Sequence, residues 1–186
     1  LDFYFPKNAL LSKLIYKNRK IATVSEAIKN SIVAKNLSNK VQNLFQPFDI
    51  KAIEYLKEAF ISETNYILAV GSMDNDVKQI DKLILAYSES NLPKQNIKLI
   101  VLGEGKNKRD YLKLVENLNL SQKVVFKGIV QNPFPYYKNA LFYVLSSKNE
   151  GLSNAIVESL ACATPVVAFD CFSGPREIIT NGHNGI

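Results

Sequence analysis

The chain has 186 residues, of which 47% are hydrophobic and 22% are charged, with 8 glycines and 7 prolines. These values are typical of a globular protein and exclude a disordered or low-complexity chain. The net charge of +6 favours an anionic partner, such as a nucleoside diphosphate, a nucleic acid or an acidic membrane surface, but does not choose among them.

The sequence gives no sign of a structural metal, a disulfide framework or a membrane span. Its two cysteines, Cys162 and Cys171, lack the close pairs of a zinc site or of a disulfide-rich fold, so we expect reduced thiols. No apolar run approaches the ~20 residues that span a bilayer, and the start does not resemble a signal peptide, which predicts a cytoplasmic location. Because the chain begins at Leu1 and stops at Ile186 inside a predicted turn, we expect a piece of a longer protein.

The first 20 residues predict an amphipathic helix, in which apolar residues such as Leu10 and Leu14 alternate with lysines. Such a stripe usually packs on a domain core, which we expect here, and contact with an anionic membrane surface is the alternative. Residues 20–24 then predict a short buried strand, and Ser25 is predicted to cap a helix over residues 26–35.

A domain boundary is predicted at residues 46–49, where Pro47 interrupts the pattern. Proline has no backbone N–H, and it restricts the preceding residue to extended geometry. We therefore expect residues 1–48 to be the end of one domain with its linker. Residues 49–186 are expected to form a second domain that is truncated at its C-terminus.

The rest of the chain alternates short apolar strands with amphipathic helices. Because parallel strands need helical crossovers, the alternation predicts an α/β fold, a Rossmann-like open doubly wound parallel sheet with helices on both faces. Such sheets bind ligands at the carboxyl ends of their strands. The predicted strands are 66–70, 97–102, 124–126, 141–145 and 165–169, and helical periodicity covers residues 77–87, 111–118 and 153–163.

Four loops that follow predicted strands carry candidate ligand-binding residues. Glycine lets the backbone approach a ligand or turn with positive φ, and although one such glycine usually just makes a turn, their recurrence at one edge indicates a site. The Gly103 loop departs from the G-x-G-x-x-G fingerprint and no lysine-bearing phosphate loop is present, which disfavours ordinary NAD enzymes and P-loop NTPases. The loops begin at Gly71-Ser72, Gly103-Glu104-Gly105, Gly128-Ile129-Val130 and Ser146.

The most informative pair of residues is Glu150 and Glu158. Glu150 precedes a predicted helix, and Glu158 lies about a turn and a half into it and projects back toward its start. Both carboxylates can then converge on one ligand, with the helix N-terminus between them offering N–H donors to phosphates. The alternative is that Glu158 lies on a solvated face, but the apolar residues around it call for a partner. The arrangement suits a nucleoside diphosphate sugar.

With these residues the sequence resembles the group 1 (family 4) retaining glycosyltransferases, which have two Rossmann-like domains and a donor site in the C-terminal one. Their Glu-x7-Glu signature corresponds to Glu150 and Glu158. The resemblance covers roughly residues 63–186, and residues 24–26 and 46–49 look like the last strand and helix of the acceptor domain and the interdomain linker. Matching segments are residues 70–71, 102–105, 126–128, 146–151, 164–168, 174–179 and 184–185.

The resemblance implies a role for each candidate residue. Glu150 would contact the donor sugar as the catalytic residue, and Glu158 would hold the nucleotide ribose. Lys78 would neutralise the diphosphate, because Ser72 stands where the family commonly has arginine, and serine offers a single hydroxyl donor. The remaining donor contacts would come from Gly71, Gly103, the backbone amides of Gly151, Leu152 and Ser153, and Gly128, Ile129 and Val130 beside the base.

The expected activity is transfer of a hexosyl unit from a UDP-sugar to a glycan or lipid-linked acceptor, with retention implied by the resemblance alone. We expect no cofactor, no metal and no nucleic acid partner. Asp74-Asn75-Asp76 is the nearest thing to a metal cluster and is predicted to be a turn, as is the region of His183. Two alternatives stay open, a non-catalytic nucleotide-binding module and a nucleotide-sugar epimerase of related fold.

Overall fold

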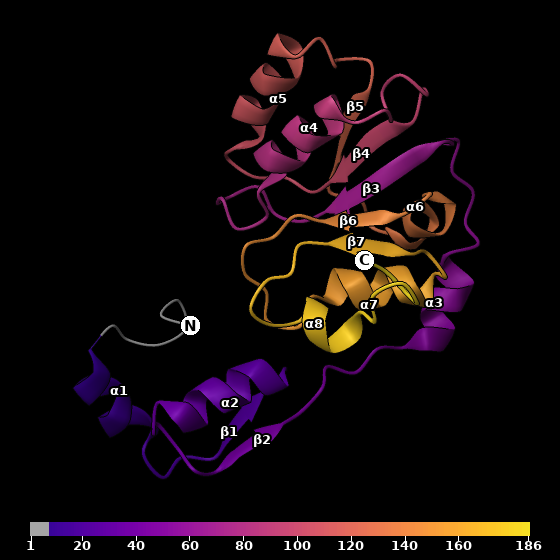
Figure 1. Cartoon of the computed structure of the whole chain (residues 1–186). Coiled ribbons are helices and arrows are strands. Elements are labelled where there is room, and N and C mark those ends of the chain that lie inside the picture. Colours follow the sequence, from indigo (N-terminus) through magenta and orange to yellow (C-terminus); the bar gives the residue numbers. More distant parts are fainter. Residues whose placement is uncertain (1–7) are drawn as a thin grey trace.

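Two separate parallel sheets organise residues 8–186, the part of the chain that the computed structural model describes (Figure 1). The smaller sheet pairs β1 (Ile21–Thr23) with β2 (Val41–Asn43). The larger sheet has the order β5-β4-β3-β6-β7, so the strand order reverses between β3 and β6. Its strands are β3 (Tyr66–Val70), β4 (Lys98–Leu102), β5 (Val124–Gly128), β6 (Tyr143–Leu145) and β7 (Val166–Ala168), each within two residues of its predicted bounds.

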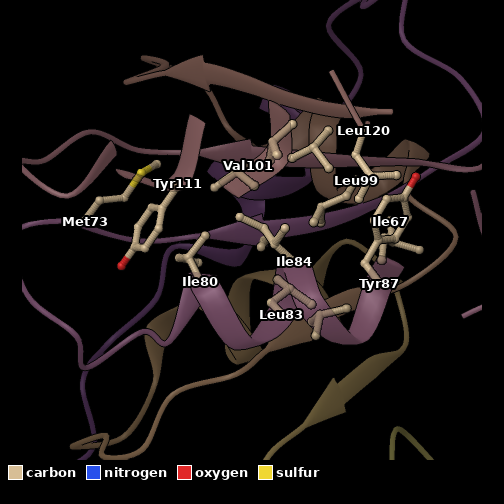
Figure 2. Close-up of a cluster of buried hydrophobic side chains, with 14 residues drawn as sticks. Ile67, Met73, Ile80, Leu83, Ile84, Tyr87, Leu99, Val101, Tyr111 and Leu120 are labelled. Atoms are coloured by element: carbon tan, nitrogen blue, oxygen red, sulfur yellow. The ribbon is translucent and has the colours of Figure 1, made fainter. Parts of the chain in front are cut away.

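Helices cover both faces of the larger sheet, which confirms the doubly wound α/β fold. On one face, α4 (Ile80–Glu89) and α5 (Lys108–Asn117) pack on alternate strand residues such as Ile67, Leu99 and Val101. Figure 2 shows Ile80 and Ile84 of α4 directed at this cluster. The intervening residues, among them Tyr66, Leu68 and Ile100, point to the other face and meet α3 (Ile50–Leu56), α6 (Phe134–Asn139) and α7 (Asn154–Ala161).

The smaller sheet differs from the prediction for residues 20–24. Ser25 caps α2 (Glu26–Ala34) as expected, since its hydroxyl accepts the N–H of Ile28 at 3.4 Å. The strand β1, predicted to be buried, exposes Ala22, because a two-stranded sheet covered by one helix leaves its other face open. The partner strand β2 was not predicted.

The prediction that the N-terminal stripe packs on a core is wrong for the described part of that stripe. In α1 (Ala9–Tyr16), Leu10 and Leu14 are each 79% exposed. The residues at 3–5, which belong to the same predicted stripe, lie outside the described residues. Within residues 8–186, no helix has the length and apolar character needed to cross a bilayer.

The Glu177 carboxylate links the C-terminal part of the chain to the helix α2. The short helix α8 (Pro175–Ile178) carries Glu177, whose side chain accepts the backbone N–H groups of Glu26 and Ala27 at 2.8 and 3.0 Å. These are the first residues of α2, where backbone N–H groups have no partner inside the helix and the helix dipole is positive. Glu177 thus links α2, the helix that covers the smaller sheet, to α8 near the C-terminal end of the larger α/β unit.

We expect Glu177→Ala to loosen this attachment by about 1 kcal/mol, less than is usual for bonds to a charged acceptor because the group is exposed. Hydrogen exchange should be roughly five-fold faster at the amides of Glu26 and Ala27 than in the unmodified protein. Glu177→Gln, which keeps one amide oxygen as an acceptor, should lose less. Unchanged exchange at both amides in Glu177→Ala would contradict this role.

Candidate functional site

Three glycine loops meet at the carboxyl edge of the larger sheet, as predicted. The N–H of Gly71 donates to the carbonyl of Leu102 at 3.0 Å, and the N–H of Gly103 donates to the carbonyl of Gly128 at 2.8 Å. Gly103 has a φ of +130°, and a Cβ atom there would lie 2.0 Å from the carbonyl oxygen of Gly71. Only glycine fits this approach, so packing of the loops already explains Gly103. Contact of these glycines with a ligand stays a prediction.

The first loop holds Ser72 in its own hydrogen bonds. The Ser72 hydroxyl donates to the Asp74 carboxylate at 2.9 Å and accepts the N–H of Asp74 at 3.1 Å. Asp74 also accepts the backbone N–H of Lys106 at 3.2 Å, and residues 74–76, predicted to be a turn, form bends that lead into a turn at residues 77–78. A phosphate at Ser72 would therefore have to compete with Asp74 for the hydroxyl proton.

The first loop is fastened to the loop that leads to Glu150. The N–H of Lys148 donates to the carbonyl of Val77 at 2.9 Å, and the Ser146 hydroxyl donates to the carbonyl of Lys78 at 2.6 Å. Lys148 and Asp76 add an ion pair between the same loops. These bonds fix the backbone of Lys78 beside the loop of residues 146–153, although the two segments are about 70 residues apart in the sequence.

Lys78 and Glu150, which the sequence analysis assigned to different parts of one ligand, are bonded to each other. The Lys78 ammonium lies 2.7 Å from Oε1 of Glu150, and the two side chains are only 23% and 11% exposed. A carboxylate so far removed from water needs a cationic or hydrogen-bonding partner. In the structure that partner is Lys78. By contrast, Lys106 and Arg109, two basic residues at and after the Gly103 loop, are exposed on the surface.

Glu158 has a different partner, the buried hydroxyl of Tyr137 on α6. This hydroxyl donates to Oε2 of Glu158 at 3.1 Å. Burial raises the pKa of the Glu158 carboxyl above its ordinary value, and the bond from Tyr137 acts in the opposite direction. Glu158 is therefore neither on a freely solvated face nor unpartnered.

Tyr143 on β6 is affected by the charges of both carboxylates. Its hydroxyl is fully buried and has no hydrogen-bond partner among the described residues. Burial raises the pKa of Tyr143 well above its ordinary value, and the negative charges of both Glu150 and Glu158 raise it further. The charges of the two carboxylates thus both act on one buried hydroxyl, whereas their convergence on one ligand stays a prediction.

The N-terminus of α7 presents backbone donors next to Glu150. Among residues 8–186, no protein acceptor is bonded to the N–H groups of Gly151, Leu152 and Ser153, and the buried Ser153 hydroxyl is also without a partner. The loop is supported from below by Gly174, whose φ is +86° and where a Cβ atom would lie 2.6 Å from the carbonyl of Leu152. Three N–H donors and a helix dipole make this a suitable place for an anion.

The family model described as "Glycosyl transferases group 1" matches residues 51–186, most of the chain. The chain belongs to this family. The match includes both glutamates, Lys78 and the loops around them, so the resemblance on which the sequence analysis relied is confirmed at the level of the family.

Two relatives of this group 1 glycosyl transferase chain are named as transferases of amino sugars. A Campylobacter jejuni protein named N-acetylgalactosamine-N,N'-diacetylbacillosaminyl-diphospho-undecaprenol 4-alpha-N-acetylgalactosaminyltransferase is 32% identical over 100% of the chain and 48% of its own length. A Staphylococcus aureus protein named poly(ribitol-phosphate) alpha-N-acetylglucosaminyltransferase is 30% identical over 78% of the chain and 29% of its own length. The chain spans about half the length of the first curated relatives it matches.

A solved structure shows the same fold. The Anabaena protein Alr3699/HepE in complex with UDP-glucose has a TM-score of 0.80 at 19% identity, covering 100% of this chain and 55% of that one. Identity this low shows the fold alone. It agrees with the Rossmann-like sheet predicted from the alternation of strands and helices.

Other predicted residues of this glycosyl transferase chain lie as follows. Ile129, assigned to the base, is 79% exposed next to the buried Gly128, and Val130 is half-buried. His183 lies in a turn, where its N–H donates to the carbonyl of Thr180 at 2.9 Å. Both cysteines are free and buried, as expected. Sequence reasoning missed the two tyrosines below the carboxylates, because nothing in their own segments marks them.

Proposed function

We propose that residues 49–186 bind a nucleoside diphosphate sugar, a UDP-sugar, at the carboxyl edge of the larger sheet. We also propose that the protein transfers the hexosyl unit to a glycan or lipid-linked acceptor with retention of configuration. The observation that carries the proposal is the Lys78–Glu150 pair at the N-terminus of α7, with free N–H groups beside it and Glu158 farther along the same helix.

Each group in this arrangement suits one part of the donor. The diphosphate would accept hydrogen bonds from the N–H groups of residues 151–153 and from the Lys78 ammonium. Both kinds of donor favour a negatively charged ligand. Glu150 would then be released from Lys78 to accept hydroxyls of the sugar, and Glu158 would accept the ribose hydroxyls. Gly71, Ser72, Gly103 and the segment Gly128, Ile129 and Val130 would complete the donor site.

The same groups account for the chemistry of transfer. As the bond between the sugar and the diphosphate breaks, positive charge grows on the sugar and negative charge on the leaving group. Lys78 and the α7 dipole would stabilise the leaving diphosphate, and the Glu150 carboxylate would lie close to the developing positive charge. Because cationic and N–H donors supply the positive charge, the proposed mechanism includes no metal.

The presence of two separate sheets supports the proposed division of the chain. Residues 1–48, with β1, β2 and α2, would be the end of an acceptor-binding domain and its linker, and the larger sheet would be the donor domain. Support for the acceptor class comes from the relatives' names, which mention a diphospho-undecaprenol-linked saccharide and poly(ribitol-phosphate). Support for the UDP-sugar comes from the HepE complex with UDP-glucose.

A cytoplasmic protein in peripheral contact with an anionic membrane is part of the proposal. The exposed Leu10 and Leu14 of α1 lie among Lys13, Lys17 and Lys20, a combination of apolar and basic groups that suits the surface of acidic lipids. Co-sedimentation with vesicles of anionic and of neutral lipid tests this contact.

Two measurements test the main proposal. Calorimetry against UDP, UDP-sugars and the corresponding GDP and ADP compounds shows whether the chain binds a donor and which base and sugar it selects. Incubation of the intact protein with the selected donor and an acceptor, followed by mass spectrometry, shows a glycosylated acceptor if the proposal holds. A free epimer, or no product, would contradict the transferase assignment.

We expect Glu150→Ala to affect the sugar more than the nucleotide. Because Glu150 accepts sugar hydroxyls in the proposed complex, its loss should reduce the gain in affinity from UDP to UDP-sugar by about ten-fold, the value of one or two bonds to a charged acceptor. Binding of UDP itself should be unchanged or tighter, since Lys78 is no longer held by a carboxylate. An unchanged ratio of the two affinities in calorimetry would remove Glu150 from the sugar site.

A further inference from the structure

Two buried tyrosines lie beneath the carboxylates of the site, and the proposed function gives them no role. Tyr137 and Tyr143 are both fully buried, with ring centroids 5.5 Å apart and ring planes at 64°. The Tyr137 hydroxyl is bonded to Oε2 of Glu158, whereas the Tyr143 hydroxyl has no partner within residues 8–186. Only the first of them therefore acts directly on a donor-site carboxylate.

We propose that Tyr137 is a positioning residue for the donor nucleotide, which orients the Glu158 carboxylate for the two ribose hydroxyls. The inference rests on the proposed function, because it takes Glu158 as the ribose ligand. Tyr137 itself touches no part of the donor in this proposal and acts through Glu158 alone.

Tyr137 is itself held rigidly enough to orient another side chain. Its ring is enclosed in the core between α6, α7 and β6, with the edge contact to Tyr143 on one side. Its backbone carbonyl accepts the Thr164 hydroxyl at 2.6 Å, which ties α6 to the segment after α7. A buried side chain at close-packed density has few alternative rotamers. The Tyr137 hydroxyl is consequently a fixed point for Glu158.

The bond from Tyr137 occupies one part of the Glu158 carboxylate and leaves the rest available to a ligand. A carboxylate has four lone-pair positions on two oxygens, and a tyrosine hydroxyl occupies one position on Oε2. The remaining positions can accept two neighbouring hydroxyls, the pattern that a ribose presents. Without the tyrosine hydroxyl, the carboxylate would be free to rotate about its terminal torsion, which has broad preferences, and the diol would have to order it on binding.

The bond from Tyr137 also favours the ionised form of Glu158, which can accept two hydroxyls. Burial raises the pKa of the Glu158 carboxyl, and the Tyr137 bond lowers it. The other titratable groups that act on this region are Tyr137, Tyr143, Cys162 and Glu150, and the cations Lys57 and Lys138 act on Cys162. The pKa of Cys162 is raised to about 11, and those of the tyrosines are raised well above their ordinary values, so none of these three titrates near neutral pH.

The test compares UDP with 2′,3′-dideoxy-UDP, which lacks the two ribose hydroxyls, in the unmodified protein and in Tyr137→Phe. We expect the variant to bind UDP about five- to ten-fold more weakly by calorimetry and to bind dideoxy-UDP as the unmodified protein does. Both nucleotides carry the same base and phosphates, so the ratio of the two affinities isolates the contact with the ribose hydroxyls. As the pH is lowered, the ratio of the affinity for UDP to the affinity for dideoxy-UDP should fall in both proteins. The fall should occur at a higher pH in Tyr137→Phe, because the Tyr137 bond no longer lowers the pKa of Glu158.

A matched control is Tyr87→Phe. Tyr87 is also buried, and its hydroxyl donates to the carbonyl of Ile97 at 2.7 Å on the opposite face of the sheet. This substitution removes a buried hydroxyl without touching Glu158 and should leave the nucleotide ratio unchanged. If Tyr137→Phe does not give a folded protein, Thr164→Val, which frees the carbonyl of Tyr137, should lower the same ratio to a smaller extent.

The outcomes separate this inference from the proposed function. Equal weakening of both nucleotides in Tyr137→Phe, or no weakening of either, would overturn the positioning role while leaving the donor site in place. If the unmodified protein binds UDP and dideoxy-UDP equally, Glu158 is not a ribose ligand and the inference fails at its first step. If it binds neither, the proposed function fails as well.

Discussion

Glu158→Ala is expected to weaken UDP binding by between about ten-fold and a hundred-fold. In the proposed complex Glu158 is a charged acceptor for two ribose hydroxyls, and bonds to charged groups contribute about 1.5–3 kcal/mol. The loss should be greater than for Glu158→Gln, whose amide oxygen can still accept one hydroxyl. Calorimetry with UDP measures both variants.

The way in which the affinity for UDP falls at low pH gives a second test of Glu158. Because burial raises the pKa of this carboxyl, the neutral acid becomes populated at a higher pH than for an ordinary glutamate. A protonated carboxyl accepts fewer hydrogen bonds, so the affinity of the unmodified protein for UDP should fall as pH is lowered through the raised value. The ratio of its affinity to that of Glu158→Gln should fall over the same range, since the amide does not titrate.

A control separates this effect from general loss of charge on a helix. Glu116 lies in α5 and is exposed. Glu116→Ala removes the same charge far from Tyr137 and should leave UDP binding unchanged. Equal UDP affinity in Glu158→Ala and in Glu116→Ala would exclude Glu158 from the nucleotide site.

Strong apolar runs made most of the larger sheet predictable from the sequence. A strand such as Tyr66–Val70 is buried on both faces, so it appears as a continuous apolar run between turn signals. The weaker elements gave no such signal. The helix α6 has only six residues with a proline inside it, and β2 contains a single apolar residue, Val41. For elements this short, tertiary packing rather than local pattern decides the structure.

Helix starts and surface stripes were less predictable for a different reason. Val77 shares the helical periodicity, but α4 begins only at Ile80, because the carbonyl groups of Val77 and Lys78 accept hydrogen bonds from the neighbouring loop. The apolar residues of α1 have the spacing of a packed helix, yet Leu10 and Leu14 are exposed in the structure. Periodicity shows that a helix has an apolar face, but does not show what covers it.

The candidate site was predictable where its residues share one element. Glu150 and Glu158 flank the start of a single helix, so their spacing alone indicates a common ligand. The partners of these carboxylates come from elsewhere. Lys78 is 72 residues from Glu150, and Tyr137 is 21 residues from Glu158. Such pairs depend on the order of strands in the sheet, which a single sequence does not specify.

Lys78→Met should weaken UDP binding by about a hundred-fold, an effect as large as any expected for this site. The stem of Lys78 packs on Gly71, where a Cβ atom would lie 2.8 Å from Cε of the lysine, so methionine keeps most of that packing and removes only the charge. The loss has two parts. The diphosphate loses its nearest cation, and Glu150 becomes an unpaired negative charge close to where the diphosphate binds.

The two parts can be separated with a double variant. Adding Glu150→Ala to Lys78→Met removes the unpaired carboxylate, so the double variant should bind UDP more tightly than Lys78→Met alone, by roughly the few-fold to ten-fold typical of close charges at a partly exposed site. Lys106→Ala, which removes an exposed lysine of the neighbouring loop, is the control and should change little. A double variant that binds UDP no more tightly than Lys78→Met would mean that the Lys78–Glu150 pair does not govern access of the diphosphate to the helix N-terminus.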